Sequence, residues 1–228
     1  MIYKKYLFVL GFILFYPFIN ARSQDNSVGN WFIYFGNQQI SKKWNWWNEV
    51  QYRNYNFAGD LEQLLLRTAI GYNLSDNNNN IQLGYGYIHA EPYIAGTNEK
   101  LSVNEHRIYQ QFITRQQFKR VFIQHRYRFE ERFLNDDTKF RFRYFLSLNI
   151  PVNKQTLEKN AFYFSTYNEI FLNTESPVFD RNRLYGGVGF VINKFFRCET
   201  GIMTQIRETK SRPQWQIILF NNLPLYKQ

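Results

Sequence analysis

Charged residues recur at every second position in long stretches of this sequence. Between Val121 and Phe133 the alternate positions carry mainly aromatic or aliphatic side chains. The charged row consists of Arg126, Arg128, Glu130 and Arg132. Successive side chains of a strand point to opposite faces, so this segment would present one charged and one aromatic face. A row of guanidinium groups either binds anions or pairs with carboxylates and amides.

The same alternation predicts a set of residues that face the interior of a β-barrel. These are Glu49, Arg53, Arg67, Glu105, Arg107, Arg126, Arg128, Glu130, Arg132, Arg141, Arg143, Arg183 and Glu199. Two interpretations stay open. The residues form a packed ladder of Arg–Glu and Arg–Gln pairs that blocks the lumen, as side chains fill small barrels. Alternatively, they form a positive constriction that favours small anions.

Other chemistries find little support. The three histidines are His89, His106 and His125, and none has a serine two positions away, so we expect no enzymatic activity. Cys198 is the single cysteine, and we expect neither a metal site nor a cofactor. The net charge is +10, but the basic residues are spread along the whole chain, which disfavours a nucleic-acid footprint.

The alternation continues through eleven candidate strands separated by turn signals such as Gly59-Asp60 and Asn135-Asp136. They cover residues 31–39, 44–56, 61–74, 78–89, 103–117, 119–133, 138–151, 160–172, 181–193, 195–208 and 212–226. Residues 60–70 also fit a helix, but a strand continues the alternation into Gly71. Single-chain bacterial barrels close with an even number of strands, so we predict ten to twelve.

The N-terminal residues 1–23 predict a cleaved signal peptide. Lys4 and Lys5 precede an apolar stretch from Tyr6 to Ile19, which is too short to span a membrane easily as a helix. Small residues then occupy positions that a signal peptidase recognises. The prediction therefore assigns residues 24–228 to one domain, delivered across an inner membrane.

Period-two alternation does not tell which face is wet, so a soluble barrel is an alternative. Several segments are 13 to 15 residues long, well above the roughly 5–6 of a typical globular strand. The mean hydropathy of -0.50 suits strands with one polar face. Aromatic residues of the apolar rows lie near segment ends, as interface girdles require. They include Trp31, Trp44, Trp46, Tyr72 and Trp215. The sequence predicts an all-β, antiparallel up-and-down transmembrane barrel.

Four blocks of sequence resemble the domain of unknown function 2490 family. They begin at Trp44, Leu61, Gly84 and Glu105, and read WNW…EVQYR, LEQLLLR, GYGY and EHRIYQQ in that order. The resemblance covers nearly all of the chain after residue 23. It implies an outer-membrane β-barrel with a signal peptide, in contact with outer-membrane lipid, and it implies no activity or site residues.

We therefore expect a protein of the cell outer membrane whose specific role is open. The first hypothesis is a small pore for anionic solutes through an Arg-lined lumen. The alternative is a plugged structural or interaction barrel without transport. A lipid-modifying enzyme is the least favoured, and the sequence indicates no oligomeric state.

Overall fold

The chain folds entirely into β-strands. The computed structural model describes residues 28–75, 78–135 and 137–226, and within them it contains eleven strands and no helix. Accordingly, no helix that could span a membrane occurs in these ranges. The strands are β1 (Gly29–Gln39), β2 (Trp44–Asn54), β3 (Leu61–Asn73), β4 (Asn79–Ala90), β5 (Val103–Phe118), β6 (Val121–Leu134), β7 (Asp137–Pro151), β8 (Phe162–Asn173), β9 (Phe179–Val191), β10 (Phe196–Ile206) and β11 (Ser211–Asn221).

Each predicted segment overlaps one of these strands, so the expected all-β fold is confirmed. The largest error in a boundary is in the last segment, which was expected to run to 226 but ends at Asn221. The predicted signal peptide, residues 1–23, lies outside the described residues. The alternative helix at 60–70 is wrong, because Leu61–Asn73 pairs along its length with β2 and β4.

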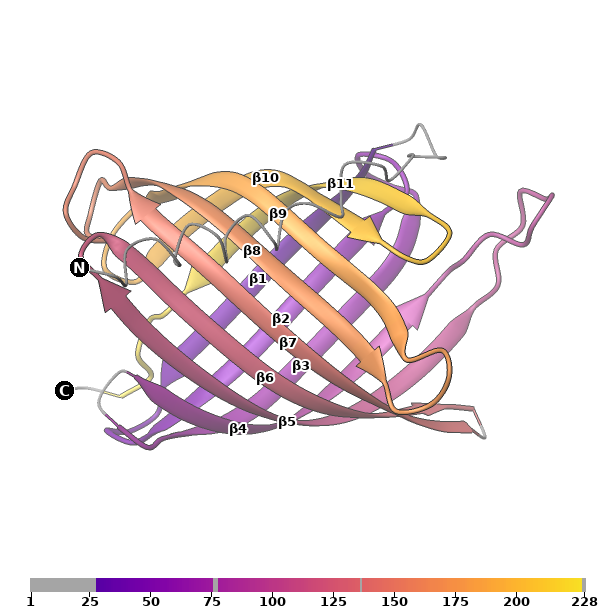
Figure 1. The fold of residues 1–228 in the computed structure, drawn as a ribbon, viewed down its shortest axis with the longest axis horizontal. Coiled ribbons are helices and arrows are strands. Elements are labelled where there is room, and N and C mark those ends of the chain that lie inside the picture. Colours follow the sequence, from indigo (N-terminus) through magenta and orange to yellow (C-terminus); the bar gives the residue numbers. More distant parts are fainter. Residues whose placement is uncertain (1–27, 76–77, 136, 227–228) are drawn as a thin grey trace, which may run out of the picture.

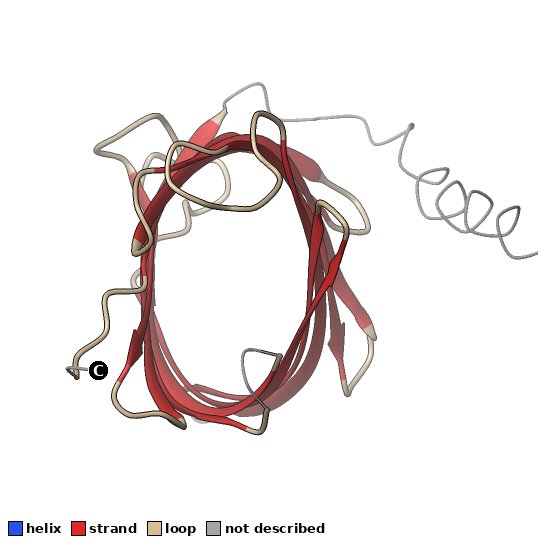
Figure 2. Cartoon of the chain, turned by 90° about the vertical axis from the view of Figure 1, so that its left-hand side faces the viewer, coloured by secondary structure: helices blue, strands red, loops and turns tan. Residues whose placement is uncertain are grey.

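The strands close into a barrel with an oval cross-section (Figures 1 and 2). Consecutive strands pair antiparallel, and β1 pairs with β11 in parallel, from Gly29 opposite Gln214 to Gly36 opposite Asn221. Eleven strands lie within the predicted ten to twelve, but the assumption that their number is even is wrong. A ring of alternating strand directions needs an even count, and eleven strands close only because one neighbouring pair is parallel.

The connections between strands gather at two ends of the barrel. We call end A the end that carries the connections β2–β3, β4–β5, β6–β7, β8–β9 and β10–β11; end B carries the others. The connection β4–β5, residues 91–102, projects beyond the barrel at end A, on the right of Figure 1.

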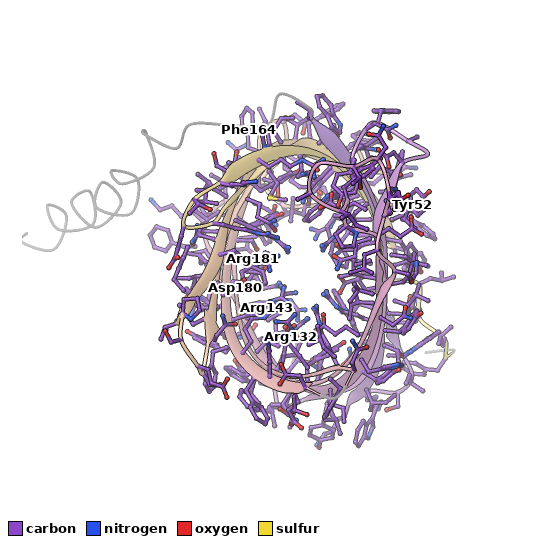
Figure 3. The ribbon with its side chains drawn as sticks, turned by 90° about the vertical axis from the view of Figure 1, so that its right-hand side faces the viewer. Tyr52, Arg132, Arg143, Phe164, Asp180 and Arg181 are labelled. Atoms are coloured by element: carbon purple, nitrogen blue, oxygen red, sulfur yellow. The ribbon has the colours of Figure 1, made fainter. Side chains whose placement is uncertain are left out.

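The wall separates an apolar exterior from a charged interior. Figure 3 looks in from end A and shows Tyr52 and Phe164 pointing outward, whereas Arg132 and Arg143 point toward the barrel axis. Along β7, for example, Arg141 and Arg143 are buried while Phe142 between them is exposed. The alternation of the sequence thus corresponds to the two faces of the wall.

One aromatic residue lies on the opposite face from the one expected. Trp44, Trp46 and Trp215 are exposed on the exterior, but Trp31 is only 2% exposed and packs inside against Ile33 and Met203. The placement of Trp31 in an outer girdle is therefore wrong. Aromatic residues occupy both parities of β1, so composition alone does not identify its inner face.

Candidate functional site: the lumen

Two cavities occupy the lumen, one behind the other. The cavity toward end A has a volume of about 860 Å³, and the cavity toward end B about 630 Å³. Both are lined by the same four residues, Trp31, Arg67, Arg143 and Arg183. We call these four residues the dividing layer, because the two cavities meet there and share them.

The end A cavity is strongly basic. Among the described residues, two acidic ones line it, Glu62 and Glu105. Its basic lining residues are Arg53, Arg67, Arg107, Arg132, Arg141, Arg143, Arg181, Arg183, Arg207, Lys210 and Arg212. Figure 3 shows Arg132, Arg143 and Arg181 around the central opening. Such a concentration of one charge between low-dielectric walls attracts counter-ions.

The residues selected from the sequence lie in or directly behind the lining of these cavities. Glu105, Arg107, Arg132, Arg141 and Arg53 line the end A cavity; Glu49, Arg126 and Glu199 line the end B cavity; Arg67, Arg143 and Arg183 line both. Arg128 and Glu130 line neither cavity and are buried in the packing of the wall.

Glu130 is the centre of the largest ion-pair cluster. Its carboxylate lies 2.6 Å from Arg141 Nη2, 2.5 Å from Arg143 Nη1 and 3.4 Å from Arg128 Nη1. A fourth guanidinium group, that of Arg107, is 3.9 Å away. Glu130 has no exposed surface, so these four guanidinium groups take the place of water around its carboxylate.

Two acidic residues extend the cluster and were missed in the sequence. Glu169 pairs with Arg126 at 2.8 Å and with Arg143 at 2.6 Å, and Asp180 pairs with Arg141 at 2.7 Å. Aromatic side chains flank Glu169 on both parities of β8, so the alternation did not reveal its inward face. Asp180 lies before the predicted start of its strand at residue 181.

The interior carboxylates do not balance the arginines around them. Glu62 pairs with Arg212 alone at the end A cavity; among the other described residues, five carboxylates form ion pairs with interior arginines, those of Glu49, Glu105, Glu130, Glu169 and Asp180. Nine arginines lie within ion-pair distance of them: Arg67, Arg107, Arg126, Arg128, Arg132, Arg141, Arg143, Arg181 and Arg183. The cluster therefore keeps a positive charge even when every carboxylate is ionised.

Two of the selected residues have no partner of opposite charge among the described residues. Arg53 is held by the side-chain oxygens of Gln51 and Gln63. Glu199 instead accepts hydrogen bonds from the hydroxyl groups of Tyr163 and Ser165, at 2.9 and 3.0 Å. The interior thus contains Arg–Gln and Tyr–Glu contacts beside its Arg–Glu pairs.

Glycines let interior tyrosines lie flat against the wall. Gly84 on β4 is directly opposite Tyr109 on β5, and a Cβ atom at Gly84 would overlap the Tyr109 ring. Gly189 stands in the same relation to Tyr163 on β8. Because each ring covers a glycine in the neighbouring strand, it takes up little of the lumen.

We expect Gly84→Ala to destabilise the barrel by about 1–3 kcal/mol, because the added methyl group forces the fully buried Tyr109 ring out of place. Gly186→Ala is the matched control, since nothing lies within 4 Å of a Cβ atom there. Denaturant unfolding of the refolded proteins measures the difference. Equal unfolding midpoints for the two variants would contradict this account of the glycine.

The long β4–β5 connection is fixed at its base beside the mouth of end A. Lys100 Nζ lies 2.6 Å from Asp60 Oδ1 and donates to the carbonyl oxygen of Leu61, also at 2.6 Å. Burial acts to lower the pKa of Lys100, but the hydrogen bond and charge of Asp60 outweigh it and raise that pKa. The cation therefore persists at neutral pH and ties this connection to the β2–β3 loop.

Two of the outward-facing histidines make hydrogen bonds with tyrosines of neighbouring strands. On the exterior, His106 Nδ1 is 2.5 Å from the hydroxyl group of Tyr85, and His125 Nδ1 is 2.9 Å from that of Tyr144. Within residues 28–75, 78–135 and 137–226, no three His, Cys, Asp or Glu side chains are placed to hold a metal ion.

Comparison with known proteins gives one match. The family model described as a protein of unknown function (DUF2490) matches residues 28–216. No curated protein and no solved structure matches the chain.

Proposed function

Since the chain belongs to the family of proteins of unknown function DUF2490, which supplies no activity, we propose from its geometry that it is an outer-membrane barrel that passes small anions. The end A cavity carries this proposal, because basic residues far outnumber acidic ones in its lining. Rings of basic side chains favour anions in this way in anion pores. We propose no catalytic role.

The exterior supports the membrane part of the proposal. Large apolar side chains are exposed along the outer face of the strands, among them Leu83, Phe142 and Phe164. Water would penalise such a continuous apolar surface, whereas lipid would solvate it. Closure also leaves no unpaired edge among the described strands, as a bilayer core demands.

The lumen supports the transport part. Each end has its own cavity, and the two cavities share the residues of the dividing layer. Arg143 in this layer is tied to Glu130 and Glu169 at once, which favours the alternative of a plugged structural barrel. Electrical measurement distinguishes the two.

The test is single-channel conductance of the refolded protein in a planar bilayer under a potassium chloride gradient. We expect discrete openings and a reversal potential that indicates chloride preference. The double substitution Arg207→Glu with Lys210→Glu should move this preference toward cations, because both residues line the end A cavity and neither forms an ion pair among the described residues.

Lys154→Glu with Lys159→Glu is the control, since this pair makes the same charge change in the exposed β7–β8 connection at end B and lines neither cavity. A protein that inserts into the bilayer and shows heat-modifiable migration but gives no conductance would favour the plugged structural barrel. A protein that stays soluble and β-rich without lipid or detergent would rule out the membrane location.

A further inference from the structure

Two arginines of the end A cavity, Arg53 and Arg183, donate hydrogen bonds to glutamine side chains. Arg53 donates from Nε and Nη2 to Gln51 Oε1, and from Nη1 to Gln63 Oε1 at 2.6 Å. Arg183 donates from Nε and Nη2 to Gln205 Oε1, at 3.0 and 2.9 Å. A glutamine oxygen orients a guanidinium group but cancels none of its charge.

Both guanidinium groups lie beside the same aromatic ring. The Cζ atom of Arg53 is 3.7 Å from the centre of the Trp31 ring, and that of Arg183 is 4.9 Å from it. Attraction to the ring partly offsets the free-energy cost of removing each guanidinium group from water. It does not remove their mutual repulsion, so two like charges are held near each other in a buried layer.

Carboxylates do little to neutralise this pair. No carboxylate of the described residues is within ion-pair distance of Arg53, and the contact between Arg183 Nη1 and Glu169 Oε2 is 3.9 Å long. Glu62, which also lines the cavity, pairs with Arg212 at 3.1 Å. The hydrogen bonds above use three of the five N–H donors of Arg53 and two of those of Arg183.

We propose that Arg53 and Arg183, positioned on Trp31, form a binding site for a multiply charged oxyanion. An oxyanion of the phosphate class offers several acceptor oxygens to the planar donor forks of two guanidinium groups. Its charge also relieves their repulsion. The proposal deepens the proposed passage of anions and rests on it, since it places a selective site at the dividing layer.

The test is a titration of the refolded protein in detergent micelles with inorganic phosphate, against chloride at equal ionic strength. Calorimetry gives the affinity, and tryptophan fluorescence reports the site. We expect saturable phosphate binding, with a fluorescence change that Trp31→Phe removes. Arg53→Gln and Arg183→Gln should each weaken binding by about tenfold or more, through loss of charge-assisted hydrogen bonds.

Arg115→Gln is the matched control, because Arg115 is also held by a glutamine, Gln124, but lines the end B cavity. It should leave the affinity unchanged. Arg53→Lys keeps the positive charge but lacks the planar set of N–H donors of a guanidinium group, so it should also weaken phosphate binding. Heat-modifiable migration on gels verifies that each variant is folded. If Arg53→Gln does not fold, the two single variants Arg183→Gln and Arg53→Lys still test the site.

If Arg53→Gln and Arg115→Gln weaken phosphate binding equally, or if Arg53→Lys keeps the full phosphate affinity, the proposed site is wrong. Phosphate would then be attracted by the general positive charge of the lumen. Absence of saturable phosphate binding would overturn the proposed site as well. Phosphate binding in micelles does not require that anions pass through the barrel, so the two proposals can fail separately. Conductance without phosphate binding would contradict only the binding site. Phosphate binding without conductance would contradict only the pore.

Discussion

Replacing Glu130 with glutamine is expected to destabilise the barrel by about 3–5 kcal/mol, the cost of removing one partner from a buried ion pair. The substitution keeps the shape of the side chain and removes its charge. It leaves the guanidinium groups of Arg141, Arg143 and Arg128 close together, with no carboxylate at the centre of the cluster. Urea unfolding in micelles measures the loss.

Glu131→Gln supplies the control on the same strand. Glu131 points outward and accepts a hydrogen bond from Gln110 Nε2 at 3.1 Å, with no arginine in ion-pair distance among the described residues. We expect its effect to stay within about 0.5 kcal/mol, as for surface substitutions in general. Similar losses for the two glutamates would show that the interior cluster does not hold the wall together.

Leu83→Arg is expected to lower the stability of the folded protein in lipid vesicles by about 2–4 kcal/mol, the cost of a lipid-facing arginine near the bilayer midplane. Leu83 lies near the middle of β4, faces outward and is 61% exposed. The fraction that folds into vesicles, followed by heat-modifiable migration, measures the effect.

Leu74→Arg places the same charge on a similarly exposed leucine in the β3–β4 connection, beyond the end of a strand. There the arginine reaches water, and we expect little change. If Leu83→Arg folds as well as Leu74→Arg, the exterior is in contact with water and the protein is a soluble barrel.

The strands and their inner faces could be predicted where the two faces differ in polarity. Along β6 and β7, arginines alternate with aromatic residues, and the side chains predicted to face inward do so. On β8 and β1, aromatic residues occupy both faces, which is why Glu169 was missed and Trp31 was placed outside.

The ion pairs could be predicted only in part, because side-chain partners depend on the register and stagger of strands. Glu130 and Arg141 are directly opposite each other, as are Glu49 and Arg67. Glu169, however, is directly opposite Phe145 and reaches Arg143 diagonally. A diagonal contact follows from the tilt of the strands, which a pattern of alternating residues does not contain.

The predicted ten to twelve strands include the eleven observed, but the assumption of an even number failed for a different reason. Every segment was found, but the rule of even numbers assumed that all neighbours are antiparallel. Whether β1 and β11 meet in parallel is decided by closure between the two ends of the chain, and no local signal in Gly29–Gln39 reports it.

That parallel seam also determines where the chain enters and leaves the barrel. With an even number of crossings, the segments that flank a barrel emerge on the same side. Here β1 begins at end A and β11 finishes at end B. In a bilayer, Gly29 and Asn221 would therefore lie at opposite membrane faces, and a peptide epitope inserted directly before Gly29 would be exposed to a different aqueous compartment from an epitope inserted directly after Asn221.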